Sequence, residues 1–279
     1  MKYFYVISNL SKDYVLDVQD EVQSCLEKRG AVCRYMTDYE RMKNGRHTPG
    51  EYVPEDTQCI ITIGGDGTLI QAARDLAGRN IPMLGINRGH LGFLNQVDRT
   101  EDIDAAMDAL VNERFRLEHR MMLRGTVFHE GNPVFQDIAL NEIIATSAEH
   151  LRVLRYDLAV NDEYLNEYAA DGVMVATPTG STAYNLSAGG PVMAPAGRMM
   201  AVTPVCSHTL NARSIVISEE DRVKIGLLGK GLVTFDGDTS QKTGPGDYLI
   251  VERSHMETVM VKLKQISFMQ NLSNYLGNV

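Results

Sequence analysis

The stretch CIITIGGDGTLIQAARDLA, residues 59–77, decides the fold of the first half of the chain. Its apolar start, residues 59–63, predicts a buried strand. The apolar residues that follow the loop suit one face of a helix: Leu69, Ile70, Ala73, Leu76 and Ala77. Strand and helix are joined by Gly64-Gly65-Asp66-Gly67-Thr68, and such a loop presents backbone N–H groups to an anion because glycine lets a phosphate approach the main chain.

Asp66 is the unexpected residue of this loop, because a carboxylate repels phosphate. It either accepts a proton from an attacking hydroxyl or helps to hold a cation such as Mg²⁺. The alternative is that Asp66 only caps the helix. The loop is not a Walker A motif, since no Gly-Lys-Ser/Thr follows, nor a G-x-G-x-x-G motif, since Ile70 occupies the last position.

The composition is that of a globular protein without broad affinity for polyanions. The chain has 279 residues, 44% of them hydrophobic, and a net charge of -9. This charge argues against binding to nucleic acids or anionic membranes, which requires a surface rich in Lys and Arg. An anionic ligand must therefore be met locally, by backbone N–H groups, a few cations or a metal.

Targeting and redox signals point to a cytoplasmic protein. The sequence shows neither a signal peptide nor an apolar run of membrane-spanning length. Its four cysteines have no C-x-x-C pairing, so neither a zinc site nor a disulfide framework is predicted: Cys25, Cys33, Cys59 and Cys206.

Residues 1–114 predict an open α/β domain, because strands and helices alternate. The expected strands are 3–8, 31–36, 59–63 and 81–87, and helices are expected around 15–26, after the glycine loop and around 103–110. Residues 37–56 are polar, contain Gly and Pro and lack apolar periodicity. We expect them to form a long mobile or disordered loop.

Residues 115–257 predict an antiparallel β-rich domain. Short β-rich runs alternate with turn signals such as Glu130-Gly131 and Asn161-Asp162. We expect the last segment, 258–279, to return to the first domain.

Later stretches carry polar groups that suit a nucleotide. Residues 171–191 mix small hydroxyl side chains with glycines, which allows close contact with a polar ligand, although a turn-rich β connection is the alternative. Asp171 and the pair Asn141-Glu142 supply acceptors for ribose hydroxyls or amino groups. Tyr184 either lies against a base or ribose or is simply packed.

These motifs together resemble those of the bacterial NAD kinases over nearly the whole chain. The motifs that carry the resemblance are, in order, Gly64–Thr68, Asn87–Leu94, Asn141-Glu142, Ala170–Pro191 and Asp236-Gly237. Lipid kinases and phosphofructokinases have related glycine loops, so residues 171–191 are the more specific part. The resemblance implies an α/β N-terminal open-sheet domain, Rossmann- or phosphofructokinase-like, and an all-β, antiparallel C-terminal domain that binds NAD.

The resemblance implies ATP-dependent phosphorylation of the 2′-hydroxyl of the adenosine ribose of NAD, which gives NADP, with Asp66 as the catalytic base. It implies ATP as the phosphoryl donor, with a divalent ion, Mg²⁺, near the glycine loop and residues 37–56. A homodimer or homotetramer is expected. The residues implied in nucleotide binding are Asp66, Gly67, Asn141, Glu142, Arg152, Ala169, Asp171, Thr182, Ala183, Tyr184, Ser187 and Gln241.

The sequence departs from the family pattern at a few positions. Ser207 and Ser214 stand where proline is usual, and Asp238 stands where glutamine is common. His90 and His208 have no visible partner, so a structural or exposed role is expected for both. The alternative functions are a diacylglycerol-type lipid kinase and a non-catalytic NAD(P)-sensing protein. Asp66 argues against a sensor, because a pure binder has no need of a carboxylate beside phosphate.

Overall fold

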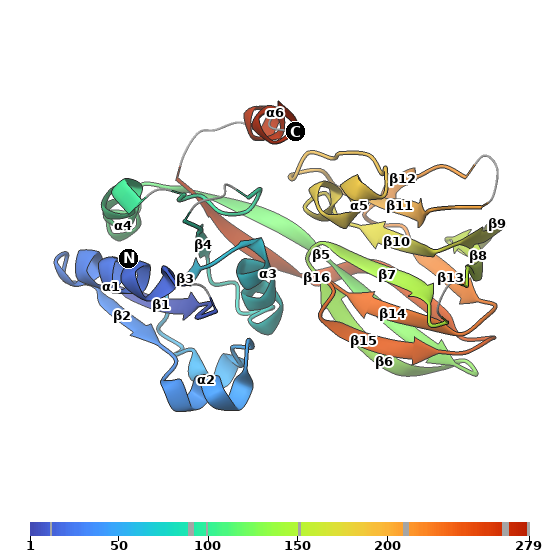
Figure 1. Cartoon of the computed structure of the whole chain (residues 1–279), viewed down its shortest axis with the longest axis horizontal. Coiled ribbons are helices and arrows are strands. Elements are labelled where there is room, and N and C mark those ends of the chain that lie inside the picture. Colours follow the sequence, from blue (N-terminus) through green and yellow to red (C-terminus); the bar gives the residue numbers. More distant parts are fainter. Residues whose placement is uncertain are drawn as a thin grey trace. The chain divides into compact units, whose positions relative to one another are not determined.

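A computed structural model of the chain describes residues 1–11, 13–88, 92–98, 100–149, 152–208, 212–263 and 268–277. The chain divides into two compact units (Figure 1). Unit 1 combines Met1–His119 with Glu257–Val279, and unit 2 is Arg120–Met256. Two long strands contribute to both units, β5 (Arg116–His129) and β16 (Tyr248–Lys262). Each unit has its own hydrophobic core.

Unit 1 is built on a parallel sheet with the strand order β2-β1-β3-β4. The strands are β1 (Tyr3–Ser8), β2 (Val32–Tyr35), β3 (Cys59–Ile63) and β4 (Met83–Ile86). The chain runs from β1 to β2 on one side and then returns to β3 on the other side of β1. The connections therefore diverge at the carboxyl ends of β1 and β3, the point where open α/β sheets form a ligand-binding crevice.

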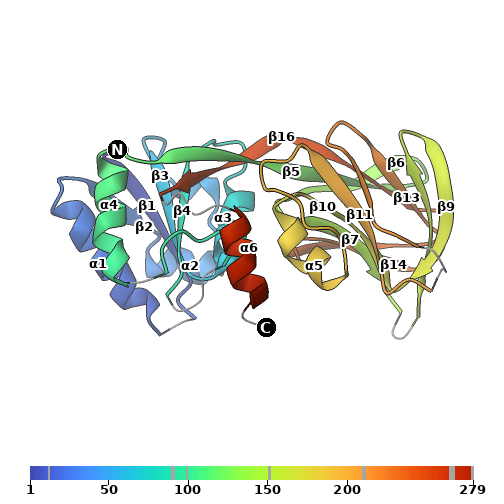
Figure 2. The same ribbon diagram turned by 90° about the horizontal axis from the view of Figure 1, so that it is seen from above.

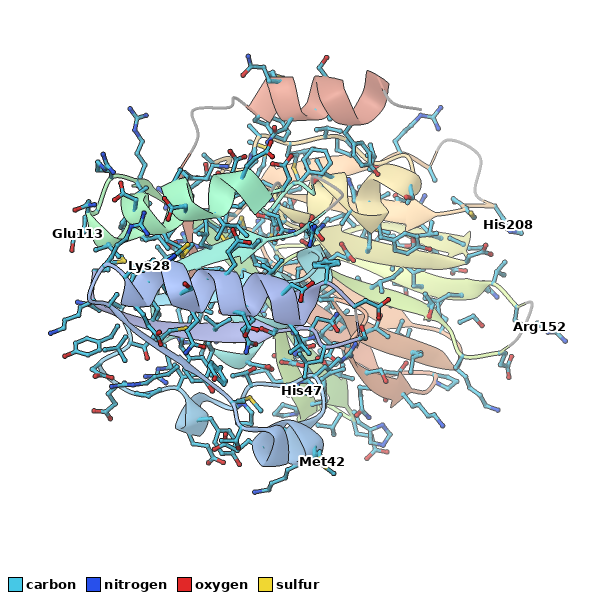
Figure 3. All side chains as sticks on the ribbon, turned by 60° about the vertical axis from the view of Figure 1, so that its left-hand side comes forward. Lys28, Met42, His47, Glu113, Arg152 and His208 are labelled. Carbon is cyan, nitrogen blue, oxygen red and sulfur yellow. The ribbon has the colours of Figure 1, made fainter. Side chains whose placement is uncertain are left out.

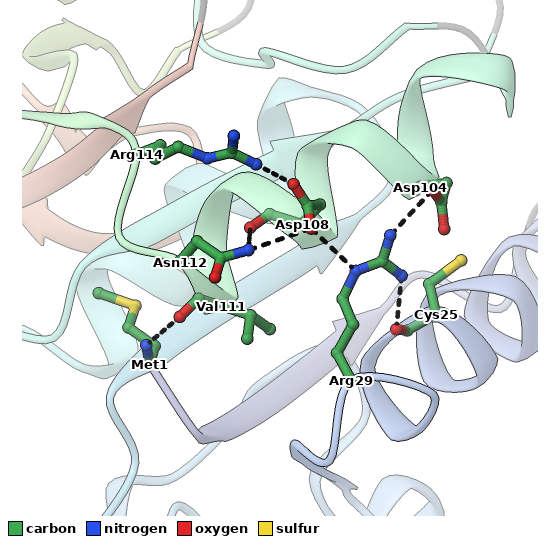
Figure 4. A network of polar contacts seen from close by, with 8 residues as sticks. All are labelled: Met1, Cys25, Arg29, Asp104, Asp108, Val111, Asn112 and Arg114. Carbon is green, nitrogen blue, oxygen red and sulfur yellow. Dashed lines mark hydrogen bonds and ion pairs between the residues drawn. The ribbon is translucent and has the colours of Figure 1, made fainter.

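Helices cover both faces of this sheet, as expected for an α/β domain. Right-handed crossovers place α1 and α3 on opposite faces, and α4 packs beside α1 (Figure 2). Arg29 links α1 to α4, because it donates to Asp104 at 2.8 Å and to Asp108 at 3.4 Å (Figure 4). The helices are α1 (Val15–Glu27), α2 (Asp38–Asn44), α3 (Asp66–Asp75), α4 (Ile103–Val111) and α6 (Phe268–Gly277), with short 3₁₀ turns η1 (Gly50–Tyr52) and η2 (Thr100–Asp102).

The polar segment 37–56 contains α2 and η1, so its prediction as a structureless loop is wrong. Thr37 and Glu40 form a capping box at the start of α2. Glu40 Oε2 accepts the backbone N–H of Thr37 at 2.7 Å, and the backbone N–H of Glu40 donates to Thr37 Oγ1 at 3.3 Å. A helix this short and polar has no apolar periodicity, and the Thr-x-x-Glu spacing was the available signal.

Unit 2 is an antiparallel β structure of two sheets, as the sequence predicts. One sheet has the order β12-β11-β10-β7-β14-β15, and the other joins β16, β13, β8 and β9 with β5 and β6. The remaining elements are β6 (Asn132–Ala139), β7 (Glu142–Ser147), β8 (Leu154–Val160), β9 (Glu163–Ala170), β10 (Gly172–Ala176), η3 (Gly180–Thr182), α5 (Tyr184–Ser187), β11 (Met199–Val205), β12 (Ile215–Ser218), β13 (Val223–Leu227), β14 (Gly231–Phe235) and β15 (Thr239–Thr243).

The two sheets of unit 2 share one core. Fully buried side chains from both sheets form it, among them Val127, Ile143, Tyr156, Val175 and Phe235. Several strands lack the apolar alternation that would predict them. In β9 the first five residues are all exposed. β10 is a short run, GVMVA, at the start of the hydroxyl-rich block, residues 171–191, and does not alternate.

Candidate functional site

The glycine loop leads from β3 into α3 at the carboxyl edge of the unit 1 sheet. Asp66 is the first residue of α3, and Gly65 is its N-cap residue. A Cβ atom at Gly64 would collide with the hydroxyl of Thr68, so this turn requires glycine. Gly67 is exposed and a Cβ atom there would meet open space. A ligand can therefore approach the main chain closely at Gly67.

A second segment of unit 1 holds the Asp66 carboxylate. The backbone N–H of Phe93 donates to Asp66 Oδ2 at 3.1 Å, and the side-chain amide of Asn95 donates to Oδ1. Gly92 lies so close that a Cβ atom there would collide with both carboxylate oxygens. Burial raises the pKa of Asp66, while the N–H donors of the second segment oppose the rise. Asp66 is thus a fixed carboxylate with a greater affinity for protons than an exposed aspartate.

Sequence reasoning missed the contribution of Asn95. It follows the 87–94 motif by one residue, and nothing in the sequence connects it to Asp66 across 29 positions. Three residues of that motif, Gly89, His90 and Leu91, lie outside the described residues.

A pocket of about 520 Å³ lies within unit 1, at the carboxyl ends of β1 and β3. One wall is the glycine loop and the first turn of α3, with Gly65, Gly67 and Thr68. Ser8, the last residue of β1, and residues 9–11 form a second wall, and residues 45–48, after α2, form a third. Its volume is in the range of pockets that hold small molecules, and it coincides with the divergence point of the sheet connections.

In unit 2, separate motifs of the sequence meet at one edge of the six-stranded sheet. β7 begins at Glu142, and its antiparallel neighbour β10 ends opposite it, at Ala176. On the other side of β7, antiparallel β14 ends at Phe235, opposite Ile143. The loops that follow β10 and β14 therefore lie beside the start of β7.

Asp236 fixes the main chain at the start of β7. Its carboxylate accepts three backbone N–H groups, from Leu140 at 2.7 Å, Asn141 at 2.8 Å and Glu142 at 3.0 Å. Gly180 packs against the backbone carbonyl of Asn141, where a Cβ atom would collide. The resemblance singled out the Asp236-Gly237 pair without giving it a role, and the structure shows Asp236 anchoring the Asn141-Glu142 pair.

Glu142, the first residue of β7, carries a buried carboxylate oxygen. Its Oε2 atom is buried and has no hydrogen-bond partner in the described part of the chain. Burial, together with the negative charge of Asp236, raises the pKa of Glu142 to about 8. A buried polar atom of this kind suits an incoming donor such as a hydroxyl or amino group.

Several hydroxyls of residues 171–191 form hydrogen bonds inside the protein. Thr177 Oγ1 donates to the Leu140 carbonyl at 2.6 Å, and Ser181 Oγ accepts the Met193 backbone N–H at 2.9 Å. Thr179 Oγ1 accepts a hydrogen bond from buried Arg120 at 3.1 Å. These residues hold η3 and α5 in place.

The predicted nucleotide-binding residues on and between η3 and α5 are more accessible. Thr182 and Ala183 are partly buried, and Tyr184 and Ser187 are exposed. The exposed fraction of Tyr184 is 45%, so its ring is available for stacking.

The structure separates the other predicted residues from this edge. Asp171 lies just before β10, whereas Thr177 follows the other end of the same strand. Ala169 lies near the end of β9. Arg152 and His208 are exposed on loops of unit 2 (Figure 3). Gln241 is on the edge strand β15, and its side-chain amide donates to the Lys242 carbonyl at 3.0 Å.

Neither a metal cluster nor a membrane helix is found in the described residues. No three His, Cys, Asp or Glu side chains gather closely enough there to hold a metal ion. Among the described helices, none is long and apolar enough to cross a membrane.

Comparison with known proteins gives consistent matches over both units. Residues 5–115 match the model of the ATP-NAD kinase N-terminal domain, and residues 140–263 match that of the C-terminal domain. An NAD kinase from Lachnospira eligens is 36% identical over 98% of this chain and 99% of its own. One from Agathobacter rectalis is 37% identical over 100% of this chain and 99% of its own.

Two solved structures share the fold. Yeast NADH kinase complexed with NADH has a TM-score of 0.86 and 21% identity, and the match covers 99% of this chain and 88% of the yeast chain. An NAD kinase from Archaeoglobus fulgidus in complex with ATP has a TM-score of 0.80 and 22% identity, with both chains covered completely.

Proposed function

The chain belongs to the ATP-NAD kinase family, and we propose that Asp66 is the base in its reaction, the ATP-dependent phosphorylation of NAD. The enzyme is a phosphotransferase with an alcohol group as acceptor. The proposal is supported by one observation above all: the Asp66 carboxylate is fixed by Phe93 and Asn95 at the start of α3. A fixed, partly buried carboxylate can take a proton from a hydroxyl without reorganising.

The proposed reaction involves the Asp66 carboxylate, the adenosine ribose of NAD and the terminal phosphate of ATP. The Asp66 carboxylate takes the proton of the 2′-hydroxyl of the adenosine ribose, and that oxygen forms a bond to the γ-phosphorus of ATP. The bond between this phosphorus and the bridging oxygen breaks, so ADP leaves and NADP forms. The chain contributes chiefly by positioning the reactants and the proton acceptor.

We assign ATP to the 520 Å³ pocket beside the glycine loop. The exposed main chain at Gly67 suits a phosphate group. We assign NAD to unit 2, where Asn141, Glu142 and the residues of η3 and α5 supply acceptors, hydroxyls and an aromatic ring. We also propose that four further residues contact NAD: Arg152, Ala169, Asp171 and Gln241.

A divalent ion, Mg²⁺, fits this assignment as a partner of the ATP phosphates. Mg²⁺ at such sites is usually held by one or two carboxylates and by substrate phosphates, so a cluster of three protein ligands is not required. When bound, it neutralises phosphate charge. We also propose that the protein is cytoplasmic, that it forms a homodimer or homotetramer, and that residues 1–114 with 258–279 and residues 115–257 act as its two functional domains.

Asp66→Asn tests the proposal. The variant keeps the size of the side chain and loses the proton acceptor, so NADP formation is expected to fall by about 10²–10⁴-fold while NAD binding persists. NADP is measured with an NADP-specific dehydrogenase after incubation with ATP, Mg²⁺ and NAD. Asp56→Asn, an exposed unit 1 carboxylate paired with Arg34 at 2.6 Å, is the control. Near-normal turnover of Asp66→Asn excludes Asp66 as the base, and an inactive wild type would favour the NAD(P) sensor.

A further inference from the structure

Among the described residues that line the unit 1 pocket, the basic side chains belong to the third wall. Arg46 and His47 line the pocket there, and none of the lining residues that the structure describes carries a carboxylate. Arg46 is always charged, and His47 is charged when protonated. Because the whole chain has a net charge of -9, a polyphosphate needs such local cations. The position of the third wall therefore determines whether the Arg46 and His47 side chains reach a bound phosphate.

One face of α3 connects the first wall of the pocket to the third. Thr68, Gln71 and Asp75 are spaced by three and four residues, so they lie on the same side of the helix. Thr68 and Gln71 both line the pocket. Asp75, in the last turn of α3, is beyond it, and only 12% of its side chain is exposed.

The Asp75 carboxylate ties residues 47 and 48 to α3. Its Oδ2 atom accepts the backbone N–H of Thr48 at 2.6 Å. Its Oδ1 atom lies 3.1 Å from His47 Nδ1 and accepts the side-chain amide of Gln71 at 2.9 Å. The amide nitrogen of Gln71 is also 3.0 Å from His47 Nδ1. Thr48 and Gln71 are buried, with exposed fractions of 2% and 8%. His47, labelled in Figure 3, is held at its Nδ1 side.

We propose that Asp75 is a positioning residue for the phosphoryl donor. It fixes residues 46–48 as the wall of the pocket that faces the glycine loop, so that Arg46 and His47 contact the phosphates of a nucleoside triphosphate. This inference rests on the proposed function, because it takes the unit 1 pocket as the ATP site. Asp75 itself touches neither substrate, and its effect is carried by the segment it holds.

The test separates binding of ATP from binding of NAD. In Asp75→Ala we expect the KM for ATP to rise about tenfold, the loss expected for one charge-assisted hydrogen bond, with the KM for NAD changed less than about twofold. Asp75→Asn keeps one acceptor oxygen and should show a smaller rise. Arg46→Met, at an exposed residue, threatens folding less and should also raise the KM for ATP by about tenfold.

Asp108→Asn is the matched control. Asp108 also anchors basic side chains in unit 1, accepting hydrogen bonds from Arg29 and Arg114, but it belongs to α4 and lies outside the pocket. We expect it to lower the melting temperature and leave the KM for ATP unchanged. A folded Asp75→Ala with an unchanged KM for ATP, or an equal rise in Asp108→Asn, overturns the proposal. So does an Arg46→Met variant that binds ATP normally.

Direct titration tests the positioning role of Asp75 independently of the proposed reaction. A non-hydrolysable ATP analogue is titrated into each full-length variant by calorimetry, without NAD. If the wild type makes no NADP but binds the analogue and Asp75→Ala binds it about tenfold less tightly, the positioning role stands and the proposed reaction fails. If NADP forms normally and both proteins bind the analogue equally, the positioning role alone is excluded.

Discussion

The two partly buried carboxylates of the candidate site, Asp66 in unit 1 and Glu142 in unit 2, have opposite surroundings. Asp66 receives hydrogen bonds from Phe93 and Asn95. Glu142 has a buried oxygen that receives no hydrogen bond from the residues that the structure describes, and a negative neighbour, Asp236. Burial raises the pKa of both groups, but only Asp66 has donors that oppose the rise.

This difference indicates two kinds of work. A carboxylate already held by donors is oriented and can accept a proton in a fixed direction. A carboxylate that lacks donors gains most when a ligand supplies them. We therefore connect Asp66 with the chemical step and Glu142 with recognition of a hydroxyl or amino group, and the following changes break or sharpen that distinction.

Gly92→Ala should have the largest effect. Its Cβ atom would collide with both oxygens of Asp66, so the carboxylate must turn away from Phe93 and Asn95. A displacement near 1 Å can cost about 10²-fold in rate, and we expect such a loss in kcat with little change in the KM for NAD. Steady-state NADP formation measures both. Gly50→Ala is the control, since the nearest described atom to a Cβ there is in the Arg79 side chain, at 3.8 Å. A Gly92→Ala variant with normal kcat would contradict the role of this contact.

Gly180→Ala is the corresponding change in unit 2. Its Cβ atom would press on the Asn141 carbonyl and shift the start of β7. We expect the KM for NAD to rise about tenfold with a smaller change in kcat, and a loss of stability of about 1–3 kcal/mol. Thermal melts and saturation curves for NAD check these values. If kcat falls instead and the KM stays constant, Asn141 and Glu142 act in the chemical step, and the distinction fails.

The sequence predicts the α/β architecture of unit 1 well because most of its strands are apolar runs and most of its helices are amphipathic. In β3 all five residues are buried, as the run CIITI indicates. The pattern fails where burial does not alternate. Strand β9, whose first five residues are exposed, pairs with β8 through backbone hydrogen bonds, and the short polar helix α2 begins at the Thr37–Glu40 capping box.

The candidate site is less predictable than the fold. The glycine loop predicts where Asp66 lies, because a local turn places it. The support from Asn95 and Asp236 depends on contacts across 29 and about 95 residues, which no local pattern encodes. The internal hydrogen bonds of residues 171–191 are unpredictable for the same reason: Thr177 and Ser181 bond to segments that the sequence does not place beside them.

Glu142→Gln should change the pH dependence of stability. The folded-state pKa of about 8 lies above the usual 4.5, so the folded chain holds this proton more tightly than the unfolded chain. The resulting stability is fully present below pH 4.5 and is lost as the pH rises through 8. Gln cannot ionise, so above pH 8 we expect the variant to melt about 2–4 °C higher than the wild type. Melting curves from pH 5 to 9 test this, and parallel curves would show that Glu142 titrates normally.

Gln241→Ala should have the smallest effect of the proposed contacts. The Gln241 amide lies on an edge strand and already donates to the Lys242 carbonyl. Removing it should therefore cost a ligand no more than one weak hydrogen bond. We expect the KM for NAD to rise by no more than about twofold, within the range of a weak exposed hydrogen bond. Saturation curves for NAD beside those of Gly180→Ala give the comparison. A rise as large as that of Gly180→Ala would mean that recognition in unit 2 extends from the start of β7 to the edge strand β15.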